Sequence, residues 1–246
     1  MPGGGSGRLV RPALAAARRW GPLLESAAQR TRREVFVARV RASAIWNNAT
    51  VDLDVADDVR LGRNVRVWVQ PWSHSVLRIG PGNTLEDNVL IQLKGGQVLL
   101  GPCVELRRDV VLNVAGRLEL HGNNPVSWNS VIHCSNRVTI EEMAGLAEQV
   151  TVADSSHYFT TPDDHFWHNV RLGEVSIGRN TWICPKVTLA RGAAVGNHCI
   201  VGSNSVVVGE VPDGSLASGV PAVIRPLPLP WADAVAAARQ RARPGA

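Results

Sequence analysis

Aliphatic residues recur at every sixth position across residues 177–211 without a slip. They are Ile177, Ile183, Leu189, Val195, Val201 and Val207. A small residue usually follows each of them, and another small or β-branched residue comes four positions after each. Six residues turn an α-helix by about 600°, so this period cannot keep one helical face apolar. The period must therefore come from a different regular structure.

A three-sided coil explains a period of six, with one aliphatic side chain pointing inward from each side and a small residue at each corner. About eighteen residues then make one turn, and turns stack at about 4.8 Å. The pattern predicts an all-β fold, a left-handed parallel β-helix of hexapeptide repeats with roughly eight or nine coils. Residues 122–129 interrupt the apolar pattern, which resumes at Ile140. The same phase appears upstream at Leu61, Val67, Ile79, Leu85, Ile91, Leu100, Leu106, Leu112, Leu118, Ile140, Leu146 and Val152.

The chain divides into three parts that differ in residue composition and pattern. Residues 1–45 mix Ala, Leu and Val with many arginines, which predicts one or two basic amphipathic helices broken near Gly21-Pro22. We expect this segment either to cap the first coil or to contact a membrane surface. Residues 46–226 are predicted to form one continuous β-helix domain. Residues 227–246 are predicted to form a tail with a short C-terminal helix.

The formal net charge of the 246-residue chain is +5, and Lys94 and Lys186 are its only lysines. This basic balance fits either arginines scattered over the surface or an anionic partner such as nucleic acid, anionic lipid or a phosphorylated cofactor. Of these partners we expect no nucleic acid. We keep peripheral membrane contact through the basic N-terminus as an alternative.

The cysteines lie far apart and form no Cys-x-x-Cys pair, which fits neither a zinc module nor a disulfide framework. They are Cys103, Cys134, Cys184 and Cys199. We expect free thiols in a reducing compartment. No apolar run reaches the length of about 18 residues that a spanning helix needs, and no signal-peptide pattern is present. The sequence thus predicts a cytoplasmic protein.

The repeat is lost over about twenty residues between Val152 and Val175. This stretch contains His157, His165 and His168 together with three aspartates and the aromatic residue types Phe, Tyr and Trp. Loops that leave a rigid scaffold are where function usually resides. A purely solvent-facing loop would explain the polar residues but would not need the aromatic ones.

Several motifs around this stretch carry a resemblance to a known family. They are Asp154-Ser155-Ser156-His157, Trp182-Ile183-Cys184, Val201-Gly202-Ser203-Asn204-Ser205-Val206-Val207 and Gly219-Val220-Pro221-Ala222-Val223-Ile224-Arg225. With them the chain resembles, over about residues 55–225, the hexapeptide-repeat O-acyltransferases of the left-handed β-helix superfamily, in particular sugar and polysaccharide acetyltransferases. The resemblance implies a homotrimer with an active site between subunits. It also implies acetyl-CoA or another acyl-CoA as co-substrate, and no metal.

The resemblance implies transfer of an acyl group from acyl-CoA to a hydroxyl of a sugar, glycan or glycosylated metabolite. His157 matches the family's catalytic histidine, and imidazole, with an unperturbed pKa near 6.5, suits a general base at neutral pH. Asp154 either fixes the tautomer of that histidine or shapes a turn. His133 either lines the acceptor pocket or is a plain coil position. Ser155 stands where the family has its first histidine.

The resemblance also assigns cofactor contacts. Trp182, Pro185 and Ser203 fall where the family lines the slot for the pantetheine arm, and Arg225 matches a residue that pairs with the CoA phosphates. The chain departs from the family in having Val208-Gly209 where Thr-Lys is usual, and one residue fewer between Pro221 and Arg225. Phosphate binding then depends on Arg225, on Arg191 or on arginines elsewhere.

Two other functions remain as alternatives. A catalytically inactive β-helix would serve as a scaffold or binding module. A zinc carbonic-anhydrase-like protein is the weaker alternative, because the Gly-His-x₄-His-Gly pattern of that branch is absent and zinc needs about three well-placed ligands.

Overall fold

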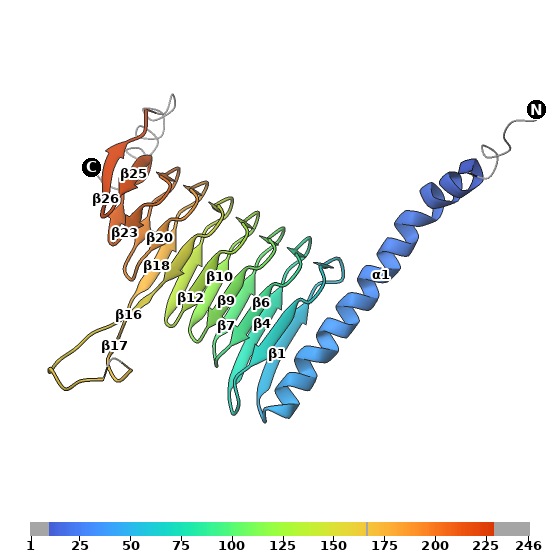
Figure 1. The fold of residues 1–246 in the computed structure, drawn as a ribbon, viewed down its shortest axis with the longest axis horizontal. Coiled ribbons are helices and arrows are strands. Elements are labelled where there is room, and N and C mark those ends of the chain that lie inside the picture. Colours follow the sequence, from blue (N-terminus) through green and yellow to red (C-terminus); the bar gives the residue numbers. More distant parts are fainter. Residues whose placement is uncertain (1–9, 166, 229–246) are drawn as a thin grey trace, which may run out of the picture.

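The computed structural model describes residues 10–165 and 167–228. Short strands wind into a solenoid of parallel coils, with one long helix across its N-terminal end (Figure 1). Three parallel sheets run along the solenoid, and we name them A, B and C. The predicted parallel β-helix is therefore confirmed. The predicted C-terminal helix lies in residues 229–246, outside the described residues.

Each sheet takes one strand from each coil, and sheet B ends in one additional, antiparallel strand. Sheet A consists of β1 Thr50–Val55, β4 His74–Ile79, β7 Gln97–Leu100, β10 Arg117–Leu120, β13 Arg137–Ile140, β18 Glu174–Ile177, β21 Ala194–Val195 and β24 Glu210–Val211. Sheet B consists of β2 Arg60–Leu61, β5 Thr84–Leu85, β8 Glu105–Leu106, β11 Pro125–Val126, β14 Gly145–Leu146, β19 Trp182–Ile183, β22 Ile200–Val201, β25 Ser215–Gly219 and β26 Ala222–Pro226. Sheet C consists of β3 Arg66–Val69, β6 Leu90–Leu93, β9 Val111–Val114, β12 Val131–Cys134, β15 Thr151–Ala153, β20 Thr188–Leu189 and β23 Val206–Val207.

Sheet C has seven strands, which corresponds to about seven full turns rather than the eight or nine expected. Two features explain why the chain makes fewer turns than expected. Coils in the first part are longer than eighteen residues, since Gln97 pairs with Arg117 and Arg117 with Arg137, twenty positions apart. Coils in the last part have the expected eighteen, as between Ser176 and Ala194. A long excursion between β15 and β18 also adds residues without adding a turn.

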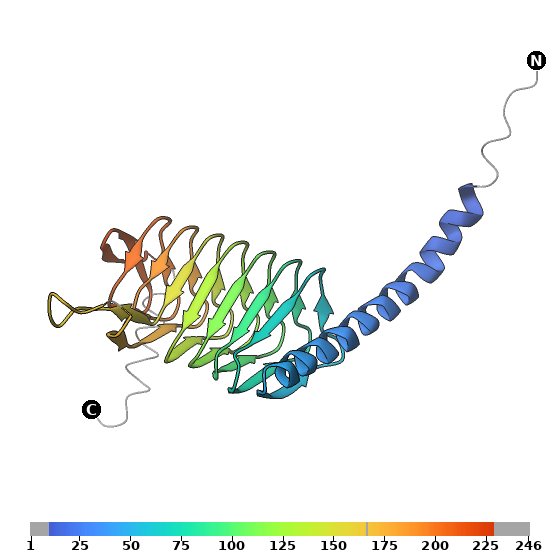
Figure 2. The same cartoon turned by 60° about the horizontal axis from the view of Figure 1, so that its bottom comes forward.

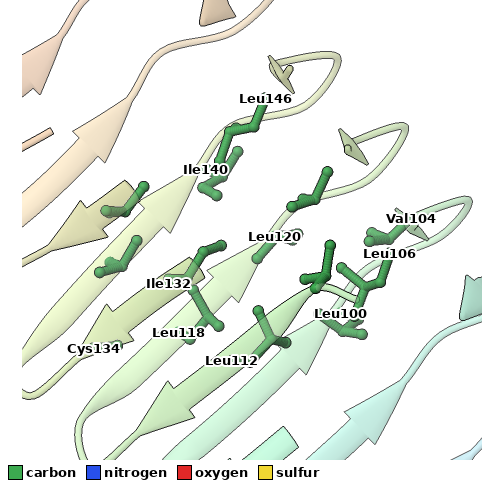
Figure 3. Packing of buried hydrophobic residues seen from close by; sticks show 14 of the residues in the cluster. Leu100, Val104, Leu106, Leu112, Leu118, Leu120, Ile132, Cys134, Ile140 and Leu146 are labelled. Atoms are coloured by element: carbon green, nitrogen blue, oxygen red, sulfur yellow. The ribbon is translucent and has the colours of Figure 1, made fainter. Parts of the chain in front are cut away.

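The inward positions predicted from the period form the core. Val67 is half-buried, and all the other aliphatic residues of the pattern are buried. Figure 3 shows side chains such as Leu106, Leu112 and Leu118 gathered in the interior of neighbouring coils. The narrow interior suits Val, Ile and Leu, which pack at crystal-like density in a stack of identical layers.

The interruption of the apolar pattern at residues 122–129 does not interrupt the coil. The coil continues through β11, and a buried Asn124 replaces an aliphatic residue at an inward corner. Its side-chain amide donates to the carbonyl oxygens of Glu141 at 2.7 Å and Ala144 at 2.9 Å, while its Oδ1 accepts from the backbone N–H of Gly122. A fully hydrogen-bonded amide is tolerated in a core, so the apolar pattern is interrupted while the coil is not.

Helix α1, Val10–Trp46, caps the first coil. Phe36, Val40 and Ala44 are buried against it. The guanidinium of Arg33 donates to the carbonyl oxygens of Ala56 and Val55 at the coil's edge. The cap predicted for residues 1–45 is thus present.

The break predicted near Gly21-Pro22 is wrong, because one helix runs through both residues. An interior proline removes one backbone hydrogen bond at a cost of about 3 kcal/mol, and it can kink a helix without ending it. Although α1 has 37 residues, neither it nor any other helix of the described chain has an apolar stretch long enough to cross a bilayer.

Candidate active site

The excursion from the repeat folds as a two-stranded antiparallel ribbon. Its strands are β16 Ser155–His157 and β17 Val170–Leu172, with His157 opposite Val170. The ribbon leaves the solenoid at the corner between sheets C and A and projects away from it (Figures 1 and 2). At its base, Arg191 Nε donates to Ser156 Oγ at 3.0 Å. The next coil therefore holds the ribbon in place.

His157 lies at the outer end of β16 with an exposed side chain. The ring of Trp167 meets its imidazole edge to face, with 6.3 Å between ring centroids and 87° between the planes. His165 stacks on the same tryptophan at 6.3 Å and 11°. Trp167, which the sequence interpretation did not single out as a site residue, therefore packs against two imidazoles. The presence of aromatic residues in a loop rich in polar ones was the available signal.

Asp164 organises the tip of the ribbon. Its carboxylate accepts hydrogen bonds from the backbone N–H and hydroxyl groups of both Thr160 and Thr161, and from Asn169 Nδ2 at 2.8 Å. The hydrogen bonds from Thr160, then those from Thr161, hold the pKa of Asp164 well below its usual range. The tip is thus a closed turn built around one carboxylate.

His165 and His168 also lie in this tip, with ring centroids 5.8 Å apart. Within residues 10–165 and 167–228, no group of three potential ligand side chains is placed to hold a metal ion. The described part of the chain therefore offers no support for a zinc site.

Asp154 is fully buried, and its carboxylate accepts hydrogen bonds from the neighbouring coil. Oδ1 accepts the backbone N–H of Ser135 and Oδ2 that of Asn136, each at 2.7 Å. Its own carbonyl oxygen accepts from Gly173 N–H at 2.8 Å, which closes the base of the ribbon. These contacts favour the turn role of the two expected for Asp154.

The thiol of Cys134 is buried beside this carboxylate. Burial, followed by the negative charge of Asp154, raises the pKa of Cys134 to about 12. The thiol therefore stays neutral at physiological pH and behaves as a small apolar core residue.

His133 lies on the exposed face of sheet C, next to the base of the ribbon. It pairs in register with Ala153, the residue before Asp154, and with Asn113 on the other side. Its Nε2 is 3.4 Å from Asn113 Nδ2. The structure thus brings His133 to the end of sheet C from which the segment with His157 departs.

The residues predicted to line the pantetheine slot lie together at the corner between sheets B and C. Trp182 is half-exposed, and its ring covers Gly145 of the preceding coil, where an added Cβ would come 2.6 Å from the ring. The thiol of Cys184 has a pKa raised by burial and is near enough to Ser203 and Trp182 to interact with both. The carbonyl oxygen of Pro185 accepts from the N–H of Asn204, the residue after Ser203.

Arg225 lies on β26, which pairs antiparallel with β25. A row across sheet B runs from Trp182 to Ile200 to Leu216 to Arg225. Three strand spacings of about 4.8 Å separate the ends of this row by roughly 14 Å. Trp182 and the exposed Arg225 therefore share one face. Arg191, the other arginine considered for phosphate binding, is instead bonded to the ribbon.

A single chain does not bring the two halves of the predicted site together. The slot with Trp182 and Pro185 comes just before β20, so it lies where a sheet C strand begins. The ribbon with His157 comes just after β15, so it lies where a sheet C strand ends. The width of sheet C separates the two groups.

Comparisons with known proteins agree with the sequence resemblance. Residues 174–209 match the family model described as bacterial transferase hexapeptide (six repeats). A probable acetyltransferase of Mycobacterium tuberculosis is 31% identical over 188 residues, which is 75% of this chain and 54% of the relative. A putative lipopolysaccharide biosynthesis O-acetyl transferase of Escherichia coli is 31% identical over 123 residues, 46% of this chain and 63% of the relative.

Two further similarities are more distant. The galactoside O-acetyltransferase of Escherichia coli is 27% identical over 118 residues, 46% of this chain and 55% of the relative. The chain thus spans only about half to two thirds of the length of these relatives. A solved N-acyltransferase from Bacillus cereus, in complex with a sugar nucleotide and coenzyme A, superposes with a TM-score of 0.48 and 14% identity over 78% of this chain and 92% of its own.

The match of residues 174–209 to the bacterial transferase hexapeptide model and the similarity to curated acetyltransferases confirm the resemblance found from the motifs.

Proposed function

We propose that the protein transfers an acetyl or other acyl group from acyl-CoA to a hydroxyl of a sugar, glycan or glycosylated metabolite. The observation that carries the proposal is the ribbon, which presents His157 beside Trp167 on an otherwise regular coil stack. The similarity to a galactoside O-acetyltransferase and to a lipopolysaccharide O-acetyl transferase supports a sugar-type acceptor.

In the proposed reaction His157 takes the proton of the acceptor hydroxyl as its oxygen attacks the thioester carbonyl. The C–S bond then breaks, and the imidazolium returns the proton to the leaving CoA thiolate. A positioned base of this kind is worth roughly 10²–10⁴-fold. Backbone N–H groups would stabilise the oxyanion, a contribution of about 10²–10³-fold. The buried Asp154 keeps the corner beneath the ribbon closed.

The proposed donor site is the corner at Trp182, Pro185 and Ser203. A pantetheine arm lying along sheet B from Trp182 would bring its phosphates toward Arg225, roughly 14 Å away. Arg225 is exposed and is the arginine at the end of that row. It would stand in for the basic residue missing at Val208-Gly209.

We further propose that the active site forms between copies of the chain in a homotrimer, in the cytoplasm. A neighbouring copy would supply the slot that faces His157, since within one chain the two lie at opposite ends of sheet C. The ribbon offers apolar surface for such a contact, because Phe159, Trp167 and Leu172 are 66%, 67% and 54% exposed. Free cysteines fit a reducing compartment.

The test is acyl transfer from acetyl-CoA to a panel of acceptors that includes a methyl galactoside and maltose, with acetylated product detected by mass spectrometry. His157→Ala should lower kcat by roughly 10²–10⁴-fold. His121→Ala, which removes an exposed imidazole on another corner, should leave the rate unchanged. Full activity of His157→Ala would refute the mechanism. Absence of CoA binding in calorimetry would favour the alternative of a scaffold or binding module.

A further inference from the structure

The positive charge of the chain is concentrated on α1. This helix carries eight arginines and two glutamates, a net charge of +6. Residues 47–228 carry 14 Lys and Arg against 18 Asp and Glu, a net charge of −4. The arginines of α1 are Arg11, Arg18, Arg19, Arg30, Arg32, Arg33, Arg39 and Arg41. Of the two expectations drawn from the net charge, this asymmetry favours an anionic partner over arginines scattered evenly.

The described half of α1 has a second apolar face, opposite the one that caps the coil. Its members are spaced by three or four residues, which places them in one stripe along the helix. All are exposed, and the most exposed are Ile45 at 78% and Trp46 at 89%. The stripe consists of Ala27, Ala28, Thr31, Val35, Ala38, Ala42, Ile45 and Trp46. We call it the outer stripe.

The hydroxyl of Thr31 does not interrupt the apolar character of the outer stripe. It donates to the carbonyl oxygen of Ala27 at 3.1 Å, so its hydrogen bond is made within the helix. Such a bond lets a threonine leave water at little cost. The outer stripe therefore offers no unsatisfied polar side chain to an apolar partner.

Arginines flank the outer stripe on both sides. At 100° per residue, Arg30 and Arg41 lie along one border and Arg39 along the other. All three side chains are exposed, and none forms an ion pair with any residue in the described ranges. Arg33, by contrast, faces the first coil and pairs with Asp57. The flanking cations are thus available to a partner.

A further exposed aromatic residue lies beside the end of the helix. The backbone N–H of Trp72 donates to the carbonyl oxygen of Asn47, the residue that follows α1, and its side chain is 80% exposed. Two highly exposed tryptophans, Trp46 and Trp72, therefore occupy one corner of the molecule. Tryptophan favours the boundary between lipid and water, where its apolar ring and its N–H group are both satisfied.

We infer that the outer stripe of α1 and its flanking arginines bind an anionic lipid surface. The apolar stripe would enter the headgroup boundary while the arginines pair with lipid phosphates, as in interfacial helices. A second copy of α1 fits less well, because two helices of charge +6 would repel each other. Nucleic acid fits less well because phosphate binding makes no use of Ile45 and Trp46. The inference is independent of the proposed acyl transfer.

The experiment is co-sedimentation of the full-length chain with vesicles of phosphatidylcholine containing 30 mol% phosphatidylglycerol. Arg39→Gln with Arg41→Gln should weaken binding about thirtyfold, since each arginine near such a surface is worth about 1 kcal/mol. Ile45→Gln with Trp46→Gln should weaken it roughly tenfold through lost apolar burial. All four side chains are exposed, so circular dichroism should show unchanged folding.

Matched controls are Arg179→Gln and Val223→Gln, exposed positions away from α1, which should bind like the wild type. Equal binding to vesicles of phosphatidylcholine alone would overturn the inference, because charge would then play no part. Loss of binding in the controls as large as in the α1 variants would also overturn it. Binding to a 20-base-pair DNA duplex that survives Ile45→Gln with Trp46→Gln, without vesicle binding, would identify a nucleic-acid surface instead.

Discussion

Replacing Asp154 by alanine should destabilise the fold far more than its place in a loop would suggest. Its carboxylate accepts two backbone N–H groups at 2.7 Å, from Ser135 and Asn136. Hydrogen bonds to a charged group contribute about 1.5–3 kcal/mol each. Both amides are near the surface, so in the variant water will replace part of the lost hydrogen bonding. We therefore take the lower end, about 3 kcal/mol for the pair.

For a domain of this size, 1 kcal/mol corresponds to about 2–4 °C in Tm, so Asp154→Ala should lower the Tm by about 6–12 °C. Thermal unfolding followed by circular dichroism measures this directly. Asp163→Ala is the matched control, since Asp163 is an exposed aspartate on the same ribbon, and its Tm should change by at most about 1 °C.

A Tm of Asp154→Ala close to that of the wild type would refute the reasoning. Asp154→Asn gives a second test, because the variant keeps one acceptor oxygen but presents an NH₂ group to the other amide. Should Asp154→Asn shift the pH profile of acyl transfer without lowering the Tm, the carboxylate would act on His157 rather than on the corner.

Two further predictions use other contacts. Gly145→Ala should raise the KM for acetyl-CoA with little change in Tm, because the new Cβ would come 2.6 Å from the ring of Trp182 and displace it; Gly209→Ala, with open space around it, should alter neither. A thiol reagent at pH 7.5 should label the exposed Cys103 and leave Cys134 unlabelled until the chain unfolds. Because the folded pKa of Cys134 is raised from 9.0 to about 12, stability should fall as the pH rises through that window; labelling of Cys134 in the native state, measured by peptide mass spectrometry, would contradict this account.

Much of the fold was predictable because a period of six has few structural solutions. The aliphatic positions from Ile177 to Val207 all became core, and no tertiary information was needed to place them. The buried position of Asn124 could not be predicted, because an asparagine that bonds backbone carbonyls in a core is indistinguishable, in sequence, from one in a surface turn. The continuous α1 was missed because Gly21 and Pro22 together indicate a break, whereas a proline can also kink a helix without ending it.

The candidate site was predictable only in part. Trp182, Pro185 and Ser203 meet at one corner because a regular coil fixes the position of every sixth residue. The role of Asp154 depended on which backbone amides lie beneath it, and those belong to a coil some twenty residues earlier in the chain. The local sequence around His157 carries no trace of that contact. Trp167 reached His157 through a ribbon whose pairing follows no repeat.

The separation of His157 from the slot makes the proposed assembly testable by mixing. If one chain contributes the base and its neighbour the slot, His157→Ala and Trp182→Ala variants should each be weak alone. In trimers refolded from an equal mixture, about a quarter of the interfaces would pair an intact His157 with an intact Trp182. Activity should then recover to roughly that fraction of the wild-type rate. A site within one chain would give no recovery, since every chain would lack one of the two groups.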